Sequence, residues 1–331
     1  MTGIVFRLNS GLGRTITNSE NLSKIRRFFF PFFCLLLIAL FFHPLRSLLS
    51  LALKGDKYSQ ILIVPFLSVF FLFTERRSLV VCEKLSFLPA ILFVGSGCAV
   101  LIISRFINLA VYPLVNLDFM ILSFLLIFIG GTVFFFGISL IASNRFPWLL
   151  LLLLIPLPSR VLGVIITFFQ YGSAEVVNLL FQLTGMTYIR DGLTFNLPSI
   201  SIFIAKECSG IRSSTALVIT ALLAGHLFLK TIPGNITLLL GVVPLTLLKN
   251  GIRITTLSIL SEKIDTKWIT DSHLHHNGGI VFFGIILVLL FMLLLAIRKI
   301  ENNILKTAVA PTPPLPPFVD GEDSGVGRMQ E

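Results

Sequence analysis

The chain has 331 residues, of which 55% are hydrophobic and only 13% carry a charged side chain. Soluble domains carry about 25% charged residues, so this composition excludes an ordinary water-soluble protein. The net charge of +10 reflects 26 Lys and Arg residues scattered between apolar runs. This scatter argues against a nucleic-acid-binding patch and favours membrane lipid as the partner of these cations.

Long apolar runs recur almost to the C-terminus, which predicts an all-α fold, namely a polytopic membrane helix bundle. The runs are continuous in Leu, Ile, Phe and Val rather than alternating, which argues against a β-barrel. The four cysteines have no CxxC spacing and therefore support neither a structural zinc site nor a disulfide framework. We expect no cofactor.

Residues 1–27 are polar and include five Lys or Arg residues, which predicts a cytoplasmic N-terminal tail. No small-residue cleavage site follows the apolar run that begins at Phe28, so we expect a retained first helix. Further spans are predicted from length and apolar content over residues 58–74, 86–104, 118–142, 147–170, 209–229, 235–258 and 279–298. The transmembrane domain, residues 28–300, therefore has about eight helices.

Residues 147–184 allow two interpretations. They form either one span followed by an amphipathic interfacial helix, or two spans broken at Pro156 and Pro158. A polar stripe on one helical face favours the interfacial helix. The stripe consists of Gln170, Glu175, Asn178 and Gln182.

With the N-terminus in the cytoplasm, the segments 43–57, 105–117, 171–208 and 259–278 lie on the outer face. Lys and Arg are only slightly more frequent on the cytoplasmic side, so the N-terminal tail carries most of the argument for this orientation. Residues 301–331 contain PTPPLPP followed by acidic and Gly residues, which predicts a disordered, Pro-rich cytoplasmic C-terminal tail.

Three segments interrupt the apolar pattern with residue types that can do chemistry. They are KECSGIRSS at 206–214, KNGIR at 249–253 and HLHHNGG at 273–279. On the eight-span interpretation all three lie at the outer face of the membrane. The sequence therefore predicts a site built from three distant parts of the chain.

Cys208 is the candidate nucleophile of this site. It lies at the predicted start of a helix, where the helix dipole and free N–H groups favour the thiolate. Arg212 follows one turn later, and Arg253 approaches from a neighbouring helix, so both cations favour the anion. A histidine can take the thiol proton and return it to a leaving amine, as in other Cys–His pairs, while Arg253 can bind an oxyanion or a carboxylate.

Simpler interpretations remain open for the same residues. Cys208 can be a packing residue, and Arg253 can extend to the membrane interface. The cluster of His273, His275 and His276 can bind a metal, although no cysteine or carboxylate pair completes a ligand set nearby, so we expect no metal. Lys206, Glu207 and Ser209 fit a helix cap.

Over about residues 40–300, the chain resembles the exosortase/archaeosortase family of polytopic membrane cysteine transpeptidases. Tyr58–Arg77 is similar to the family's Tyr-Ser-His-Gly-type segment, with Gln60 and Ile61 in place of His-Gly. ECSGIRSS resembles the Ala-Cys-Ser-Gly-type motif, with Glu207 in place of a small residue. NGIR resembles the Asn-x-x-Arg motif.

In the family, a histidine precedes a glycine by four positions at the start of the last helix, which corresponds to His275 here, with His276 as an alternative. The resemblance thus implies Cys208 as nucleophile, His275 as base and then acid, and Arg253 as the group that stabilises the thiolate or oxyanion. Arg212 and Asn250 are supporting residues. A strand-like segment precedes the family's cysteine motif, and residues 192–210 are similar to it.

The resemblance also implies a substrate class. Family members recognise exported proteins whose C-terminal sorting signal combines a short motif such as Pro-Glu-Pro, a transmembrane helix and a basic cluster. They cut near the motif and pass the new C-terminus to an acceptor, often alongside exopolysaccharide production. The plasma membrane is the expected location, with the active site on the non-cytoplasmic face.

Two other functional classes are compatible with a polytopic protein. A transporter places ionisable residues inside its spans, and His226 is the one candidate for such a relay, although a contact with neighbouring polar groups accounts for it better. A non-catalytic factor of polysaccharide assembly is the second class. The presence of Cys208, Arg253 and His275 together argues against a lost catalytic function.

Overall fold

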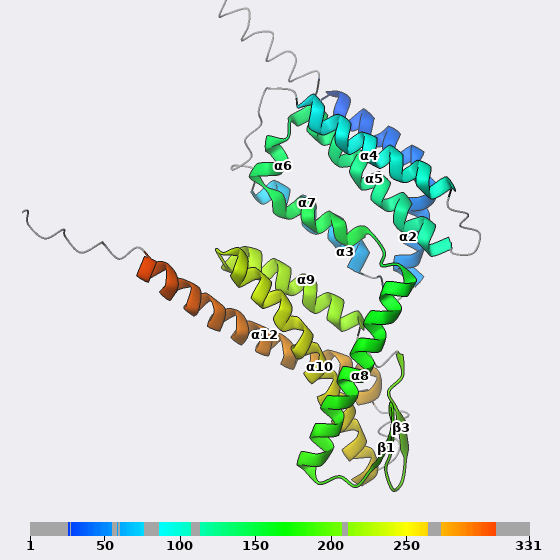
Figure 1. Ribbon diagram of the computed structural model, residues 1–331, viewed down its shortest axis with the longest axis vertical. Helices are drawn as coiled ribbons and strands as arrows, with labels where there is room; N and C mark the ends of the chain where they lie inside the picture. The colour runs from blue at the N-terminus through cyan, green and yellow to red at the C-terminus, as the bar shows by residue number, and fades with distance from the viewer. Residues whose placement is uncertain are drawn as a thin grey trace, which may run out of the picture.

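The predicted apolar segments form helices in the computed structural model (Figure 1), which describes residues 26, 28–54, 58, 60–75, 86–106, 113–206, 211–263 and 273–308. A helix over Phe28–Leu40 leads into the first labelled element. The helices that follow are α2 (Phe42–Lys54), α3 (Gln60–Thr74), α4 (Phe87–Phe106), α5 (Pro113–Phe136), α6 (Ser139–Ser143), α7 (Arg145–Leu151), the 3-10 turn η3 (Leu152–Leu154), α8 (Ser159–Thr184), α9 (Ile211–Phe228), α10 (Ile232–Lys263) and α12 (His273–Ala308). The strands are β1 (Ile189–Asp191), β2 (Thr194–Asn196) and β3 (Ser201–Phe203).

The prediction of a polytopic helical membrane protein is confirmed. Among the described residues, five helices are long and apolar enough to cross a membrane, and the total is six if the helix over Phe28–Leu40 and its continuation Phe42–Leu53, bent by 73°, form one span. The predicted spans at 58–74 and 209–229 are shorter apolar helices. The 15 residues of α3 extend only about 22 Å at 1.5 Å per residue, less than the roughly 30 Å hydrocarbon core.

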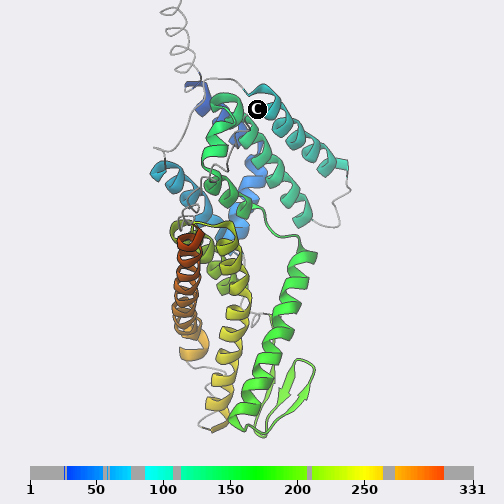
Figure 2. The ribbon, with the colours of Figure 1, turned by 60° about the vertical axis from the view of Figure 1, so that its left-hand side comes forward.

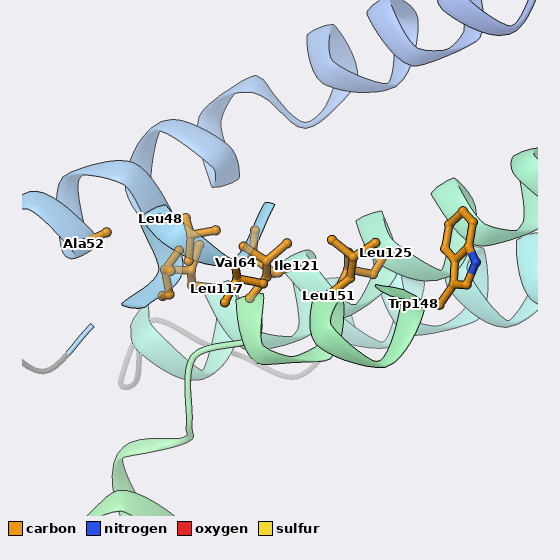
Figure 3. Close-up of a cluster of buried hydrophobic side chains, with 10 residues drawn as sticks. Leu48, Ala52, Val64, Leu117, Ile121, Leu125, Trp148 and Leu151 are labelled. Carbon is orange, nitrogen blue, oxygen red and sulfur yellow. The ribbon is translucent and has the colours of Figure 1, made fainter. Parts of the chain in front are cut away.

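The larger of two apolar clusters in the first half of the described chain joins four of its helices. Its side chains come from α2, α3, α5 and α7 (Figure 3), and they include Leu48, Val64, Ile121, Trp148 and Leu151. In addition, Ser68 on α3 donates a hydrogen bond to the carbonyl of Pro147 at 2.8 Å. These contacts hold the short helices α3 and α7 together although neither is long enough to be a span by itself.

The helix predicted over 147–170 is not continuous. The chain leaves η3 at Ile155, whose backbone is extended, and α8 begins at Ser159 immediately after Pro158. Proline disfavours a helical conformation in the residue before it, and Ile155 and Leu157 each precede one. The interpretation of residues 147–184 as two helices broken at Pro156 and Pro158 is therefore correct about the helix boundaries. The second of these helices, α8, is among the five candidate spans.

The polar stripe on α8 contacts protein rather than only the membrane interface. Gln170 donates from Nε2 to the carbonyl of Ile204 at 2.9 Å, and Tyr188 donates its hydroxyl to Asn178 at 2.6 Å. Glu175 forms an ion pair with Arg190 at 2.7 Å. The stripe thus positions the segment 188–204 along α8.

That segment is a three-stranded antiparallel sheet with strand order β1-β2-β3. The strands β2 and β3 confirm the strand-like segment expected before the cysteine motif, and they add a small sheet to a fold predicted as all-α. Phe195 and Ile204 are buried with Phe181 of α8 and Ile254 of α10. The sheet therefore lies against the two helices that border the candidate site (Figures 1 and 2).

The second half is built from α9, α10 and α12. Figure 2 shows α10 and α12 side by side, and Leu238 and Val242 of α10 share a buried cluster with Ile286, Leu290 and Leu294 of α12. The helix α12 continues to Ala308, past the boundary at 301 predicted for the C-terminal tail. The rest of that tail, the predicted N-terminal tail except Arg26, and several connecting segments lie outside the described residues.

His226 links the two halves. Its Nε2 lies 2.6 Å from Oε1 of Glu75 at the end of α3, and its ring stacks on Phe146 with centroids 3.7 Å apart. The polar contact expected for this residue is therefore confirmed. The contact also fixes the direction of α3 and α9, because it joins their C-terminal ends.

Candidate functional site

The KNGIR segment lies in the middle of the second half, where α10 meets α8 and α9. Lys249 and Asn250 are both buried, with 7% and 1% of their surface exposed. Lys249 donates from Nζ to the hydroxyl of Ser213 in the first turn of α9. Asn250 donates from Nδ2 to the hydroxyl of Ser173 on α8 at 2.9 Å. Burying such groups in a membrane helix is costly unless they are paired, and these two side chains join α10 to both neighbours.

Two glycines allow α8 and α10 to approach closely at this level. A Cβ added at Gly172 would lie 2.8 Å from Leu247, and one added at Gly251 would overlap the side chain of Val176. Small residues at helix contacts let backbones come together inside a membrane, where packing and hydrogen bonds replace the hydrophobic effect. The Asn250–Ser173 hydrogen bond depends on this approach.

We expect Gly251→Ala to destabilise the protein although alanine is the better helix former. Overpacking costs about 1–3 kcal/mol, which exceeds the gain of about 1 kcal/mol from helix propensity. The thermal unfolding midpoint of the protein purified in detergent measures the effect. Gly284→Ala on α12 is the matched control, since a Cβ there meets no described atom within 4 Å, and equal midpoints for the two variants would contradict the packing argument.

Arg253 follows Lys249 by one turn of α10. Residues four apart share a helical face, so the two cations lie on the same side of α10, with Lys249 held against α9. Arg253 is half-buried. This part of α10 therefore directs one buried and one half-buried cation toward the same region of the bundle.

The end of α10 is also held to the sheet. Glu262 accepts hydrogen bonds from the backbone N–H and the hydroxyl of Ser199 at 3.3 and 3.0 Å. Hydrogen bonding to Glu175 raises the pKa of Arg190 above its ordinary value, as expected for a guanidinium held in an ion pair between α8 and the sheet. Together these contacts keep the sheet at the end of α8 and α10 that lies beyond Arg253.

The other predicted site residues are placed by their backbone only, or not at all. Cys208 lies outside the described residues, three positions before the first residue of α9. Arg212 is in the first turn of α9, and His275 and His276 are in the first turn of α12. The side chains of these three residues are not part of what the structure describes.

The helix arrangement brings the start of α9, after the Cys208 segment, next to the KNGIR segment of α10. It also places the start of α12, with the histidine segment, at the same end of the bundle. The Lys249–Ser213 hydrogen bond holds the first turn of α9 against α10, one turn before Arg253. The helices α10 and α12 run antiparallel on either side of residues 264–272, so the start of α12 lies at the Arg253 end of this pair. Whether the thiol, guanidinium and imidazole groups meet stays a prediction.

Sequence reasoning missed Lys249, Ser213 and Ser173 as members of this region. The segment KNGIR predicts roles for Asn250 and Arg253 but none for Lys249. A signal was available, because lysine inside an apolar run is rare and marks a functional or paired position. The serines carry no comparable signal, since a single serine in a membrane helix often bonds only to its own backbone.

The sequence profile of a family described as "Transmembrane exosortase" matches residues 52–292. The match covers all three predicted segments and extends from α2 to α12. No curated protein and no solved structure matches the chain.

Proposed function

Because this chain belongs to the transmembrane exosortase family, whose members process C-terminal sorting signals in the membrane, we propose that it is a membrane-embedded cysteine peptidase or transpeptidase. Its substrates are exported proteins that end in a short motif, an apolar span and a basic cluster. Cleavage takes place on the non-cytoplasmic face of the plasma membrane and serves envelope or exopolysaccharide assembly.

Each proposed role follows from the chemistry of the side chain. The thiolate of Cys208 attacks the scissile carbonyl, and the tetrahedral oxyanion is stabilised by Arg253. His275, or its neighbour His276, takes the thiol proton and returns it to the leaving amine. Water, or an amine or hydroxyl acceptor, then resolves the acyl-thioester. Arg212 and Asn250 act as supporting residues.

The hydrogen bond between Lys249 and Ser213 carries the proposal. It joins the first turn of α9, which begins three residues after Cys208, to the turn of α10 that precedes Arg253. Two segments separated by about 40 residues of sequence are thereby held side by side. This proximity supports a shared site for the cysteine and the arginine.

The function is tested with an exported reporter protein that ends in such a signal, taken from a protein of the same organism. The reporter and this protein are co-expressed in a host that lacks sorting enzymes, and the reporter's C-terminus is determined by mass spectrometry. A product shortened near the short motif, formed only with this protein present, is the expected result. A reporter that keeps its entire C-terminus would argue for the non-catalytic alternative.

Lys249 is proposed as a positioning residue of this site. We expect Lys249→Met, which keeps the length of the side chain but removes its charge and hydrogen bond, to slow reporter processing about ten- to hundredfold, as a charge-assisted hydrogen bond contributes about 1.5–3 kcal/mol. With one cation fewer near the thiolate, the pH at which processing is half-maximal should move upward.

The control is Lys263→Met at the end of the same helix, where the side chain is exposed. It should leave both the rate and the pH profile unchanged. A purely structural role of Lys249 would lower the amount of folded protein without moving the pH profile, and that result would contradict the positioning role.

A further inference from the structure

A cavity of about 480 Å³ lies between the two halves of the protein. Its walls come from the start of α3, from η3 and the break that follows it, and from α8, α9 and α10. The break at Ile155–Pro158, which separates α7 from α8, contributes Ile155, Pro156 and Leu157 to the lining. Neither Lys249 nor Asn250 lines the cavity, although Ser214 at its polar end belongs to the predicted Cys208 segment.

The cavity is apolar over most of its surface and polar at one end. Among the described residues that line it, polar side chains are confined to Tyr58, Gln60, Ser214 and Thr215. The contact between Glu75 and His226 joins the C-terminal ends of α3 and α9, so the N-terminal ends of these helices lie together at the opposite end. The four polar residues belong to these N-terminal ends.

The cavity is continuous with the surface that faces the membrane. Leu240 and Leu157 both line it, although 65% and 44% of their residue surfaces are exposed. Leu240 lies within α10, one of the candidate spans, so its exposed side faces lipid hydrocarbon. A chain from the surrounding bilayer can therefore reach the interior without crossing water.

The volume decides which occupant fits. A group the size of a water molecule takes up about 30 Å³. A space of about 480 Å³ therefore holds about 16 groups of this size, which is the number of carbon atoms in one acyl chain. A membrane-spanning helix 10 Å wide and 30 Å long occupies on the order of 2400 Å³, about five times more. A whole transmembrane helix therefore does not fit inside this space, while a single hydrocarbon chain does.

We propose that this cavity binds one acyl chain of a membrane phospholipid, with the head group beside Ser214 and Thr215 at the start of α9. The Gln60 amide offers hydrogen bonds to the glycerol esters, and the apolar walls of α8, α9 and α10 surround the chain. The chain fills the space between the halves and so stabilises their arrangement. This role goes beyond the proposed cleavage reaction and stands whether or not Cys208 is a nucleophile.

The full-length protein is reconstituted in vesicles of phosphatidylethanolamine and phosphatidylglycerol that contain a trace of phosphatidylethanolamine with a photoreactive diazirine on its acyl chain. After illumination, labelled residues are mapped by mass spectrometry. We expect labels on residues 214–219, which are at least partly shielded from bulk lipid in the structure. Labels on α9 confined to its exposed residues Leu227 and Phe228 would overturn the proposal.

Val218→Trp fills the cavity and should lower labelling of residues 214–219 at least fivefold. Leu227→Trp is the matched control, because it adds the same side chain to an exposed position of the same helix, and it should leave this labelling unchanged. Equal labelling in wild type and Val218→Trp would contradict the proposal, as would labelling of 214–219 by a photoreactive sorting-signal peptide but not by the lipid. If Val218→Trp does not accumulate, the wild-type map alone decides.

Discussion

Cys208→Ala should abolish cleavage of the reporter while the protein still inserts in the membrane in normal amounts. Without a nucleophile no acyl-enzyme forms, and in a well-studied serine protease loss of the nucleophile lowers kcat by about 10⁶-fold, which is below detection in a cellular assay. The measurement compares the fraction of shortened reporter, by immunoblot and mass spectrometry, at matched enzyme levels.

Cys98→Ala provides the control for Cys208→Ala. Cys98 lies on α4 with its side chain exposed, so its removal tests the effect of losing a thiol elsewhere in the same protein. It should process the reporter at the wild-type rate. Processing at the wild-type rate in Cys208→Ala would refute the nucleophile assignment and leave a polytopic membrane protein of the exosortase family with another role.

Arg253→Gln should slow processing by about 10²- to 10³-fold, the usual effect of removing one group that stabilises an oxyanion. The loss should appear in kcat rather than in KM, because the oxyanion exists only after attack. Arg253→Lys should recover only part of the activity, since lysine keeps the charge but lacks the planar, two-pronged donor geometry of arginine. Initial rates at several reporter-peptide concentrations, with purified enzyme in detergent, separate the two constants.

The matched control for Arg253 is Arg298→Gln on α12. Arg298 is exposed and lies 6.0 Å from the ring centre of Phe228, so its charge belongs to the opposite end of the α9–α12 pair. Its removal should leave kcat within about twofold, because an exposed side chain away from Arg253 changes stability by only about 0.5 kcal/mol. An Arg253→Gln variant with unchanged kcat and raised KM would show that Arg253 binds a substrate carboxylate instead of the oxyanion.

The buried polar residues of α10 connect these predictions to the fold. Lys249 and Asn250 are buried in a helix whose length and apolar composition are otherwise those of a membrane span. Polar residues at such positions commonly mark a functional site. Their hydrogen bonds to Ser213 and Ser173 offset the cost of burial. Arg253 is positioned one turn further along the same rigid element.

The strand-like segment before Cys208 was expected from the resemblance to the exosortase family, whereas the amino-acid sequence by itself was sufficient to predict the helical membrane fold. It was also sufficient to identify α10 as the element with Asn250 and Arg253. These are local properties, because a helix in lipid satisfies its own backbone hydrogen bonds and its apolar length can be read from one segment at a time. The predicted roles of Cys208, Arg212, His275 and His276 rest on motifs, and Cys208→Ala tests the role of the nucleophile.

Only the tertiary structure decided which side chains meet. The stripe from Gln170 to Asn178 contacts the sheet, Lys249 bonds to Ser213, and the break after Ile155 replaces a span predicted as continuous and contributes to the lining of the apolar cavity. None of these contacts can be read from the hydropathy of one segment, because a polar side chain in a membrane protein is stabilised by whichever helix lies beside it. The neighbours, in turn, are set by the packing of the whole bundle, down to the close approach of α8 and α10 at Gly251.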